Sequence, residues 1–259
     1  MRTKDLIDLA ADPNLISGIY NYCDRWCERC EFSGRCLLYA TEKADEDDDP
    51  NSRDLNNEAF WRKLAAIFAQ TQEMISEWAK ESGVDLSPDA VAEANAHNDQ
   101  TLEQTEQHPL TIAAEKYALT VNQWFENELQ QVEVFSDTGG ESNEDEEGDD
   151  ADEYFEVIRW YQFLIAVKLM RGISSRFDED EYEDEDRQDS NGSAKVALIA
   201  IDRSISAWKL IAELRSENKD SILPVLLDLE KLRLQAEKEF PDARGFIRPG
   251  FDERLETLH

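Results

Sequence analysis

The four cysteines of the chain, Cys23, Cys27, Cys30 and Cys36, lie within fourteen residues, CDRWCERCEFSGRC. The other 245 residues contain none. Thiolates are ligands for zinc and for iron–sulfur clusters, and four of them complete either kind of site. In a reducing compartment, clustered cysteines more often bind metal or do redox chemistry than form structural disulfides. The spacing therefore predicts a metal site held by these four residues.

The spacing also bears on which metal is bound. Cys23, Cys27 and Cys30 fall on one face of a helix that is predicted to begin at Asp12-Pro13. Seven residues of α-helix rise about 10.5 Å, whereas the sulfurs of a tetrahedral zinc site lie about 3.8 Å apart. A straight helix through Cys30 therefore favours a [4Fe-4S] cluster, and a helix that ends near Cys27 would allow zinc. Both cofactors stay open, as does the alternative that the thiols only extend an apolar stripe.

The residues between the cysteines suit either metal. Four thiolates leave a net negative charge on the site, which Arg25, Arg29 and Arg35 are placed to offset. Three aromatic side chains are placed to exclude water from it: Tyr22, Trp26 and Phe32.

The first three cysteines are spaced C-x3-C-x2-C, which resembles the cluster loop of radical-SAM enzymes. That resemblance implies a βα barrel with a cluster that keeps one iron free of protein ligands. This sequence shows no alternation of strands with helices, and Cys36 offers a fourth ligand. We therefore do not assign the chain to that family.

No other segment predicts a reaction. The histidines are only His97, His108 and His259, too few for a di-iron bundle site. Phosphate-binding loops, dinucleotide fingerprints and nucleophile elbows are absent from the sequence. Two classes of function remain. The favoured one is a non-enzymatic metal-binding protein with an interaction or regulatory role, and the alternative is an iron–sulfur redox protein or enzyme component.

The charge of the chain restricts its partners. The formal net charge is −32, and residues 42–54, 137–156 and 178–189 hold 27 of the 59 acidic side chains. Such a chain is unsuited to nucleic acid or anionic membranes, which need clustered Lys and Arg. The acidic segments are expected to be solvent loops, with docking of a basic protein partner as the alternative. The N-terminus lacks the apolar run of a signal peptide, so a cytoplasmic location is expected.

Six segments show the apolar period of amphipathic helices. Five of them are long: 57–81, 110–135, 152–175, 194–215 and 221–239. The sixth, 87–98, is short, and its apolar face is mostly alanine. No strand pattern appears. The sequence therefore predicts an all-α fold, an antiparallel helical bundle of about five long helices, with an N-terminal four-cysteine helix-loop and long acidic disordered loops.

These patterns divide the chain into four predicted parts. The four-cysteine segment covers residues 1–41 and the acidic linker covers 42–56. The helical bundle covers 57–240, with acidic inserts at 137–152 and 178–192. The irregular tail covers 241–259.

A few charges interrupt the apolar faces. Glu128 and Arg203 each lie on an apolar helix face, and Glu156 and Arg159 are spaced to pair along one helix. A buried charge needs a partner. We expect structural ion pairs between helices, such as Glu128 with Arg203, with a functional polar pocket as the alternative.

Overall fold

A computed structural model describes residues 9–44, 54–137, 151–177 and 185–252. Every regular element in these ranges is helical, which confirms the all-α fold class. None of the described helices is long and apolar enough to cross a membrane. The chain divides into two compact units, described separately below. The N-terminal unit comprises Met1–Tyr20, Arg25–Asp99 and Pro249–Phe251, and the bundle unit comprises Asn21–Asp24, Gln100–Arg248 and Asp252–His259.

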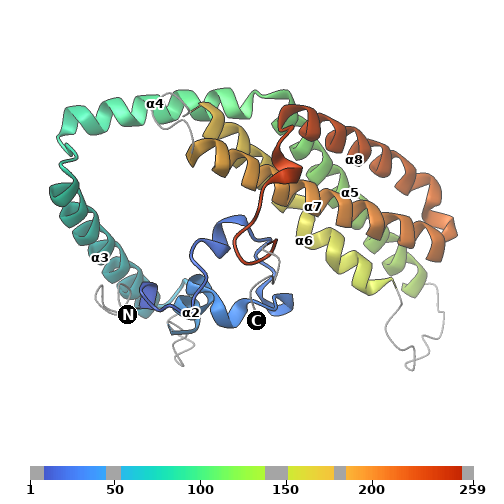
Figure 1. Cartoon of the computed structure of the whole chain (residues 1–259). Coiled ribbons are helices and arrows are strands. Elements are labelled where there is room, and N and C mark those ends of the chain that lie inside the picture. The colour runs from blue at the N-terminus through green and yellow to red at the C-terminus, as the bar shows by residue number, and fades with distance from the viewer. Residues whose placement is uncertain (1–8, 45–53, 138–150, 178–184, 253–259) are drawn as a thin grey trace, which may run out of the picture. The chain divides into compact units, whose positions relative to one another are not determined.

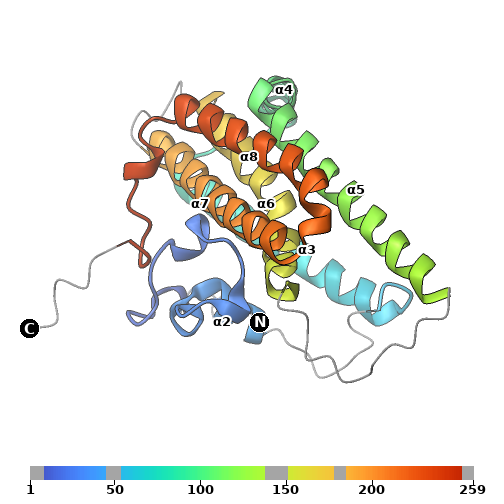
Figure 2. The same cartoon turned by 90° about the vertical axis from the view of Figure 1, so that its right-hand side faces the viewer.

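The bundle unit is built on four long helices that lie side by side in both views (Figures 1 and 2): α5 (Pro109–Asp137), α6 (Asp152–Phe177), α7 (Glu185–Leu214) and α8 (Lys219–Glu239). Successive helices run antiparallel. Phe125, in the second half of α5, contacts Phe155 at the start of α6. Ser190, near the start of α7, donates a hydrogen bond to the carbonyl of Gly172 near the end of α6. Four of the five predicted long helices thus form an antiparallel bundle, and the fifth, predicted over 57–81, belongs to the N-terminal unit.

The largest fully buried side chain among the described residues is Trp208 of α7, in the bundle unit. The centre of its ring lies 4.9 Å from the ring centre of Trp124, in an edge-to-face contact. Its indole N–H donates to the hydroxyl of Tyr117 at 3.4 Å. Because Tyr117 is itself buried, its pKa is raised to about 12. Large aromatic groups of this kind dominate the energetics of a core.

Two helix boundaries differ from the predicted ones. Helix α7 begins at Glu185 rather than at residue 194, so the second half of the predicted insert 178–192 is helical. Arg171 explains part of this extension, because its guanidinium binds the Asp189 carboxylate at 2.7 Å. Helix α4 (Pro88–Glu106) continues past its predicted end near residue 98 and buries Thr101 and Thr105. Residues 138–150 and 178–184 of the inserts lie outside the described residues.

The start of α8 also differs from the predicted one at residue 221. The helix begins two residues earlier, at Lys219. The Ser221 hydroxyl donates to the carbonyl of Asn218 and accepts a hydrogen bond from the Trp124 indole at 3.0 Å.

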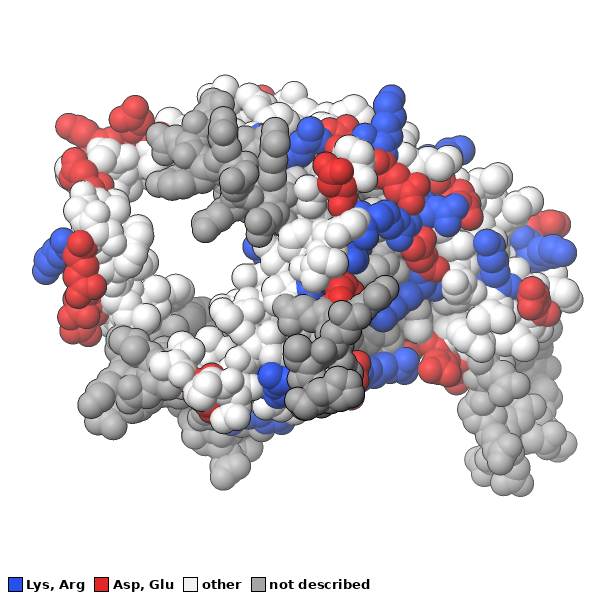
Figure 3. All heavy atoms as spheres, in the orientation of Figure 1, with Lys and Arg blue, Asp and Glu red and all other residues white. Residues whose placement is uncertain are grey.

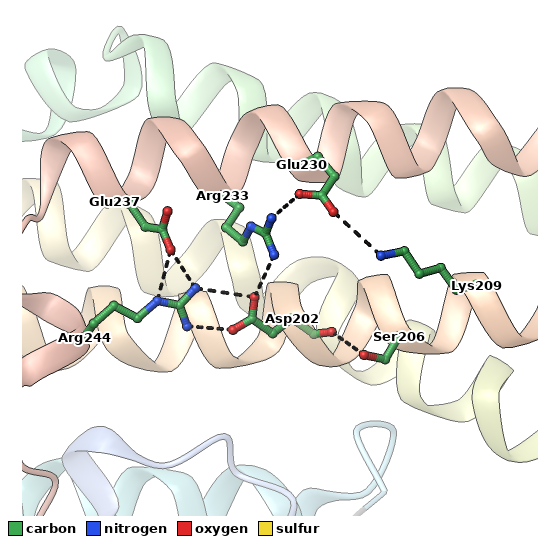
Figure 4. A network of polar contacts seen from close by, with 7 residues as sticks. All are labelled: Asp202, Ser206, Lys209, Glu230, Arg233, Glu237 and Arg244. Carbon is green, nitrogen blue, oxygen red and sulfur yellow. Dashed lines mark hydrogen bonds and ion pairs between the residues drawn. The ribbon is translucent and has the colours of Figure 1, made fainter.

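The segment after α8 is fastened to the bundle by ion pairs (Figure 4). Arg244, in the short helix η6 (Ala243–Gly245), binds Asp202 of α7 at 2.6 Å and Glu237 of α8 at 2.8 Å. Phe240 and Ala243 are buried beside them. The described part of the predicted tail, residues 241–252, is therefore non-helical apart from η6, as predicted, and residues 253–259 lie outside the described residues.

In the N-terminal unit, the longest helix is α3 (Glu58–Ser82), followed by the first part of α4. Asn57 caps α3 by accepting a hydrogen bond from the Ala59 N–H at 3.0 Å, and Gly83 ends it with φ of 70°. A shorter helix, α2 (Leu37–Ala44), lies within the segment predicted as the end of the cysteine region and the start of the acidic linker. Among the described residues of α3, only Ala79 is buried.

Candidate functional site

The cysteine segment is not the continuous helix that its periodicity predicted. It contains three short 3-10 turns: η1 (Ile19–Tyr22), η2 (Cys27–Arg29) and η3 (Ser33–Arg35). Gly18 and Arg25 have positive φ angles of 71° and 61°, which an α-helix cannot contain. Asp12 does not cap a helix either, since its carboxylate accepts from the Asn14 N–H in a local turn. The prediction of a helix running from Asp12-Pro13 through Cys30 was wrong.

From Cys27 onwards the backbone forms consecutive tight turns. The N–H of Cys30 donates to the carbonyl of Cys27 at 3.3 Å, and the N–H of Ser33 donates to that of Cys30. The N–H of Cys36 then donates to the carbonyl of Ser33 at 3.2 Å. A turn closed between residues i and i+3 brings their Cα atoms within about 7 Å. Because no helix runs from Cys23 to Cys30, the rise of about 10.5 Å that disfavoured zinc in the sequence argument does not apply to these residues.

All four cysteines are partly buried, and none of them forms a disulfide bond. In the part of the chain that the structure describes, no group of three or more His, Cys, Asp or Glu side chains is arranged so that it could hold a metal ion. The donor set matches a thiophilic metal in number and kind. The metal site of Cys23, Cys27, Cys30 and Cys36 stays a prediction.

The arginines between the cysteines bind groups of the N-terminal unit. Arg25 forms an ion pair with Glu42 of α2 at 2.9 Å. The Arg35 guanidinium donates to the carbonyl of Asn14 at 3.1 Å, and the guanidinium of Arg29 lies 4.2 Å from the ring centre of Trp26. These contacts stabilise the turns. The expected role of the arginines in offsetting thiolate charge stays a prediction.

The first part of the cysteine segment, Asn21–Asp24, belongs to the bundle unit. Side chains of α6 fix it there by donating hydrogen bonds to the backbone carbonyls of Asn21 and Asp24. Lys168 of α6 is buried and donates to the carbonyl of Asn21 at 3.1 Å. The Trp160 indole, also on α6, donates to the carbonyl of Asp24 at 2.9 Å. Backbone carbonyls that face a folded surface need such donors.

The Asp24 carboxylate is held by two further donors. The Tyr161 hydroxyl donates to it at 2.7 Å, and the Arg203 guanidinium binds it at 2.8 Å. Arg203 also donates to the Tyr161 hydroxyl. We call this set of contacts, made by Trp160, Tyr161, Lys168 and Arg203 with Asn21–Asp24, the Asp24 anchor.

Tyr161 and Arg203 of the Asp24 anchor keep their protons at neutral pH. Burial, and then the hydrogen bond to Asp24, raise the pKa of Tyr161 to about 12. Burial would lower the pKa of Arg203, but its contacts with Tyr161 and Asp24 outweigh that and raise it. Neither group can exchange a proton near pH 7. These two side chains therefore hold the chain in place with a fixed protonation state.

Tyr22 adds an apolar contact to the same attachment. A Cβ placed on Gly192 of α7 would lie 2.3 Å from the Tyr22 ring, so only glycine allows this approach. The Tyr22 ring also contacts Phe246, whose ring centre lies 4.8 Å from that of Tyr22. Burial, followed by the neighbouring Asp189, raises the pKa of Tyr22 to about 12. The prediction that Tyr22 shields a metal is untested, but the ring clearly docks on the bundle.

Two of the charges that interrupted the apolar faces, Arg203 and Arg159, contact groups other than those expected. Arg203 binds Asp24 and Tyr161, and Arg159 lies with its guanidinium 4.4 Å from the ring centre of Phe125. Glu156 is exposed on α6, and the side chain of Glu128 lies outside the described residues. The sequence identified Arg203 as unusual but not its partner, because Asp24 lies 179 residues away.

Comparison with known proteins does not extend this picture. No family model matches the chain, and neither does any curated protein or solved structure at a significant level. The candidate site therefore rests on the residues themselves.

Proposed function

We propose that this chain is a non-enzymatic metal-binding protein in which Cys23, Cys27, Cys30 and Cys36 bind one metal ion. The observation that supports it best is the run of tight turns from Cys27 to Cys36, which leaves the thiols on a loop instead of a rigid helix. Such a loop can close on a metal without unwinding regular structure. Binding would draw together thiols that the described chain does not group.

Zinc is the metal that we propose. Structural zinc sites commonly use two cysteines separated by two to four residues, as in Cys23-x3-Cys27 and Cys27-x2-Cys30. A structural site contributes folding free energy, because ligands and metal come together only in the folded state. The metal would thus order the N-terminal segment, and a protein partner would supply the biological role.

The Asp24 anchor supports a positioning role for this segment. It fixes the residue next to Cys23 on the bundle through groups that do not titrate near neutral pH. In the proposal, Cys23 is the ligand that the bundle unit holds in place through its neighbour Asp24. No reaction is assigned to the site.

Metal analysis of protein purified under anaerobic conditions tests the proposal. We expect a colourless protein with one zinc per chain. Cys27→Ser and Cys36→Ser should abolish stoichiometric binding, whereas Ser33→Ala, which changes the same loop without removing a thiol, should retain it. Wild-type protein without bound metal, which also fails to bind added zinc, would refute the proposal.

The same experiment distinguishes the iron–sulfur alternative. A brown protein that contains iron and sulfide, and that loses both in the cysteine variants, would overturn zinc in favour of a cluster with four cysteine ligands. Docking of a basic partner on the acidic segments is a different prediction, which this experiment does not test. Those segments lie mostly outside the described residues.

A further inference from the structure

A single turn of the backbone closes Cys27 and Cys30 together. The N–H of Cys30 donates to the carbonyl of Cys27 at 3.3 Å, and a turn of this kind keeps the two Cα atoms within about 7 Å. A disulfide bond usually joins residues whose Cα atoms lie about 4.4–6.8 Å apart. The two residues are therefore spaced so that a disulfide can form with little movement of the backbone.

The other two cysteines are placed differently. Two successive turns separate Cys36 from Cys30, because the N–H of Ser33 donates to the carbonyl of Cys30 at 3.4 Å and the N–H of Cys36 donates to that of Ser33 at 3.2 Å. Cys23 belongs to the bundle unit, whereas Cys27 belongs to the N-terminal unit. Cys27 and Cys30 are therefore the pair that the described backbone closes in one turn.

Neighbouring contacts hold this turn in position. The N–H of Cys27 donates to the carbonyl of Arg25 at 3.0 Å, and the N–H of Arg29 donates to that of Trp26 at 3.1 Å. Trp26 is buried, with the Arg29 guanidinium 4.2 Å from its ring centre, and the Arg25 guanidinium binds Glu42. A backbone that is already ordered loses less conformational entropy when a bond closes across it.

The exposure and charge of the chain favour a small, neutral oxidant. Cys27 and Cys30 are only partly buried, so a small molecule can reach their sulfurs. The formal net charge of −32 opposes the approach of an anionic oxidant. On the face shown in Figure 3, the Lys and Arg side chains are interspersed with Asp and Glu rather than gathered where they would draw anions. Hydrogen peroxide is both small and uncharged.

We propose that Cys27 and Cys30 form a reversible disulfide bond when hydrogen peroxide oxidises them, and that this bond releases the metal. One thiolate attacks a peroxide oxygen and breaks the O–O bond, which leaves a sulfenic acid and hydroxide. The other thiolate attacks that sulfur, forms the S–S bond and expels a second hydroxide. The two sulfurs lose two electrons, and the peroxide, with two protons from solvent, becomes two water molecules. A thiol reductant reverses the bond.

The release of metal rests on the proposed function of the four cysteines, but the disulfide does not. A zinc ion that loses Cys27 and Cys30 keeps only Cys23 and Cys36, which are too few for a closed tetrahedral site. Oxidation thus empties the site, and reduction restores it.

Peptide mapping identifies the linked pair, because Arg25, Arg29 and Arg35 place the four cysteines in four different tryptic peptides. The full chain is stripped of metal with a chelator and treated with hydrogen peroxide, and the remaining thiols are alkylated before denaturation and digestion. Mass spectrometry should show peptides 26–29 and 30–35 joined as the main linked product, and a thiol reductant should separate them. Another pair as the main product, or both thiols still open to alkylation, would overturn the proposal.

Variants separate the disulfide from the metal site. Cys30→Ser should lose the link, whereas Cys36→Ser should keep it even though, by the proposed function, that variant no longer binds zinc stoichiometrically. Ser33→Ala is the matched control and should retain both the link and the zinc. Failure of the link in Cys36→Ser would contradict an assignment to Cys27 and Cys30 alone.

The zinc-loaded chain tests the release. Peroxide should free one zinc for each disulfide formed, as measured with a chromogenic chelator. Zinc that stays bound after the Cys27–Cys30 bond has formed, or that leaves without it, would overturn the release and leave the zinc site standing. A disulfide in a chain that never binds zinc would support the redox pair and refute the proposed function.

Discussion

Helices α7 and α3 are both long and both have apolar periodicity, but the apolar face of α7 is buried and that of α3 is exposed. Most apolar residues of α7 are buried against neighbouring helices, and Trp208 is fully enclosed. Helix α3 buries only Ala79 among its described residues. An apolar face thus shows that a helix needs a partner, but the face alone does not show whether the same chain provides it.

Small residues account for part of this difference. Ser190, Ser193, Ala194 and Ala197 of α7 are all buried. A Cβ added to Gly172 of α6 would lie 3.2 Å from the carbonyl oxygen of Ser190, so the two backbones are already close. The apolar face of α3 instead exposes the large rings of Trp61, Phe68 and Trp78, which need a partner that can accommodate them. The predictions below test this contrast, beginning with the largest effect.

Trp208→Ala should destabilise the bundle unit by about 3–5 kcal/mol, the usual cost of truncating a fully buried aromatic residue. Urea unfolding followed by circular dichroism measures the change. Trp78→Ala on α3 provides the matched comparison and should cost far less in dilute protein. Similar losses in the two variants would remove the distinction between the helices.

Alkaline pH should destabilise the bundle through Tyr117. The pKa of this buried tyrosine is about 12, against 10.0 in the unfolded chain. Its contribution is fully present below pH 10 and is lost as pH rises towards 12, because the unfolded chain releases the proton first. A shift of this size corresponds to about 3 kcal/mol. Unfolding measured from pH 9 to 12 should show a smaller decline in Tyr117→Phe; an identical decline would contradict the assignment.

Asp24→Ala should destabilise the bundle unit by about 1–3 kcal/mol, because it leaves the Tyr161 hydroxyl and the Arg203 guanidinium without their shared acceptor. Asp228→Asn is the control, since it weakens an exposed ion pair with Lys116 and should cost at most about 1 kcal/mol. Urea unfolding compares the two. If Asp24→Ala cost no more than the control, the anchor would be only a surface contact.

Phe68→Ala should change the stability of the isolated chain by no more than about 0.5 kcal/mol, as for an exposed site. The measurement requires protein dilute enough to be monomeric, because a dimer would add stability through mass action. A loss of several kcal/mol in the monomer would mean that α3 packs within its own chain.

The sequence predicted the helices of both units well, but it failed at the cysteine segment for a local reason. The apolar period from Leu15 to Cys30 is genuine, yet Gly18 and Arg25 take positive φ angles that stop a helix. The Ser-Gly pairs at Gly18 and Gly34 were a signal of turns. Arg25 gave no such signal, because a non-glycine residue rarely adopts that conformation.

By itself, the sequence determined the helical class, most helix boundaries and the clustering of the four cysteines along the chain, since these depend on residues close together in the chain. Only the tertiary structure decided that Asp24 meets Tyr161 and Arg203, which lie 137 and 179 residues away. It also decided that α7 is covered within the bundle unit, whereas the N-terminal unit leaves the apolar face of α3 exposed. Contacts of this kind follow from how the faces pack, and periodicity specifies a face without specifying its neighbour.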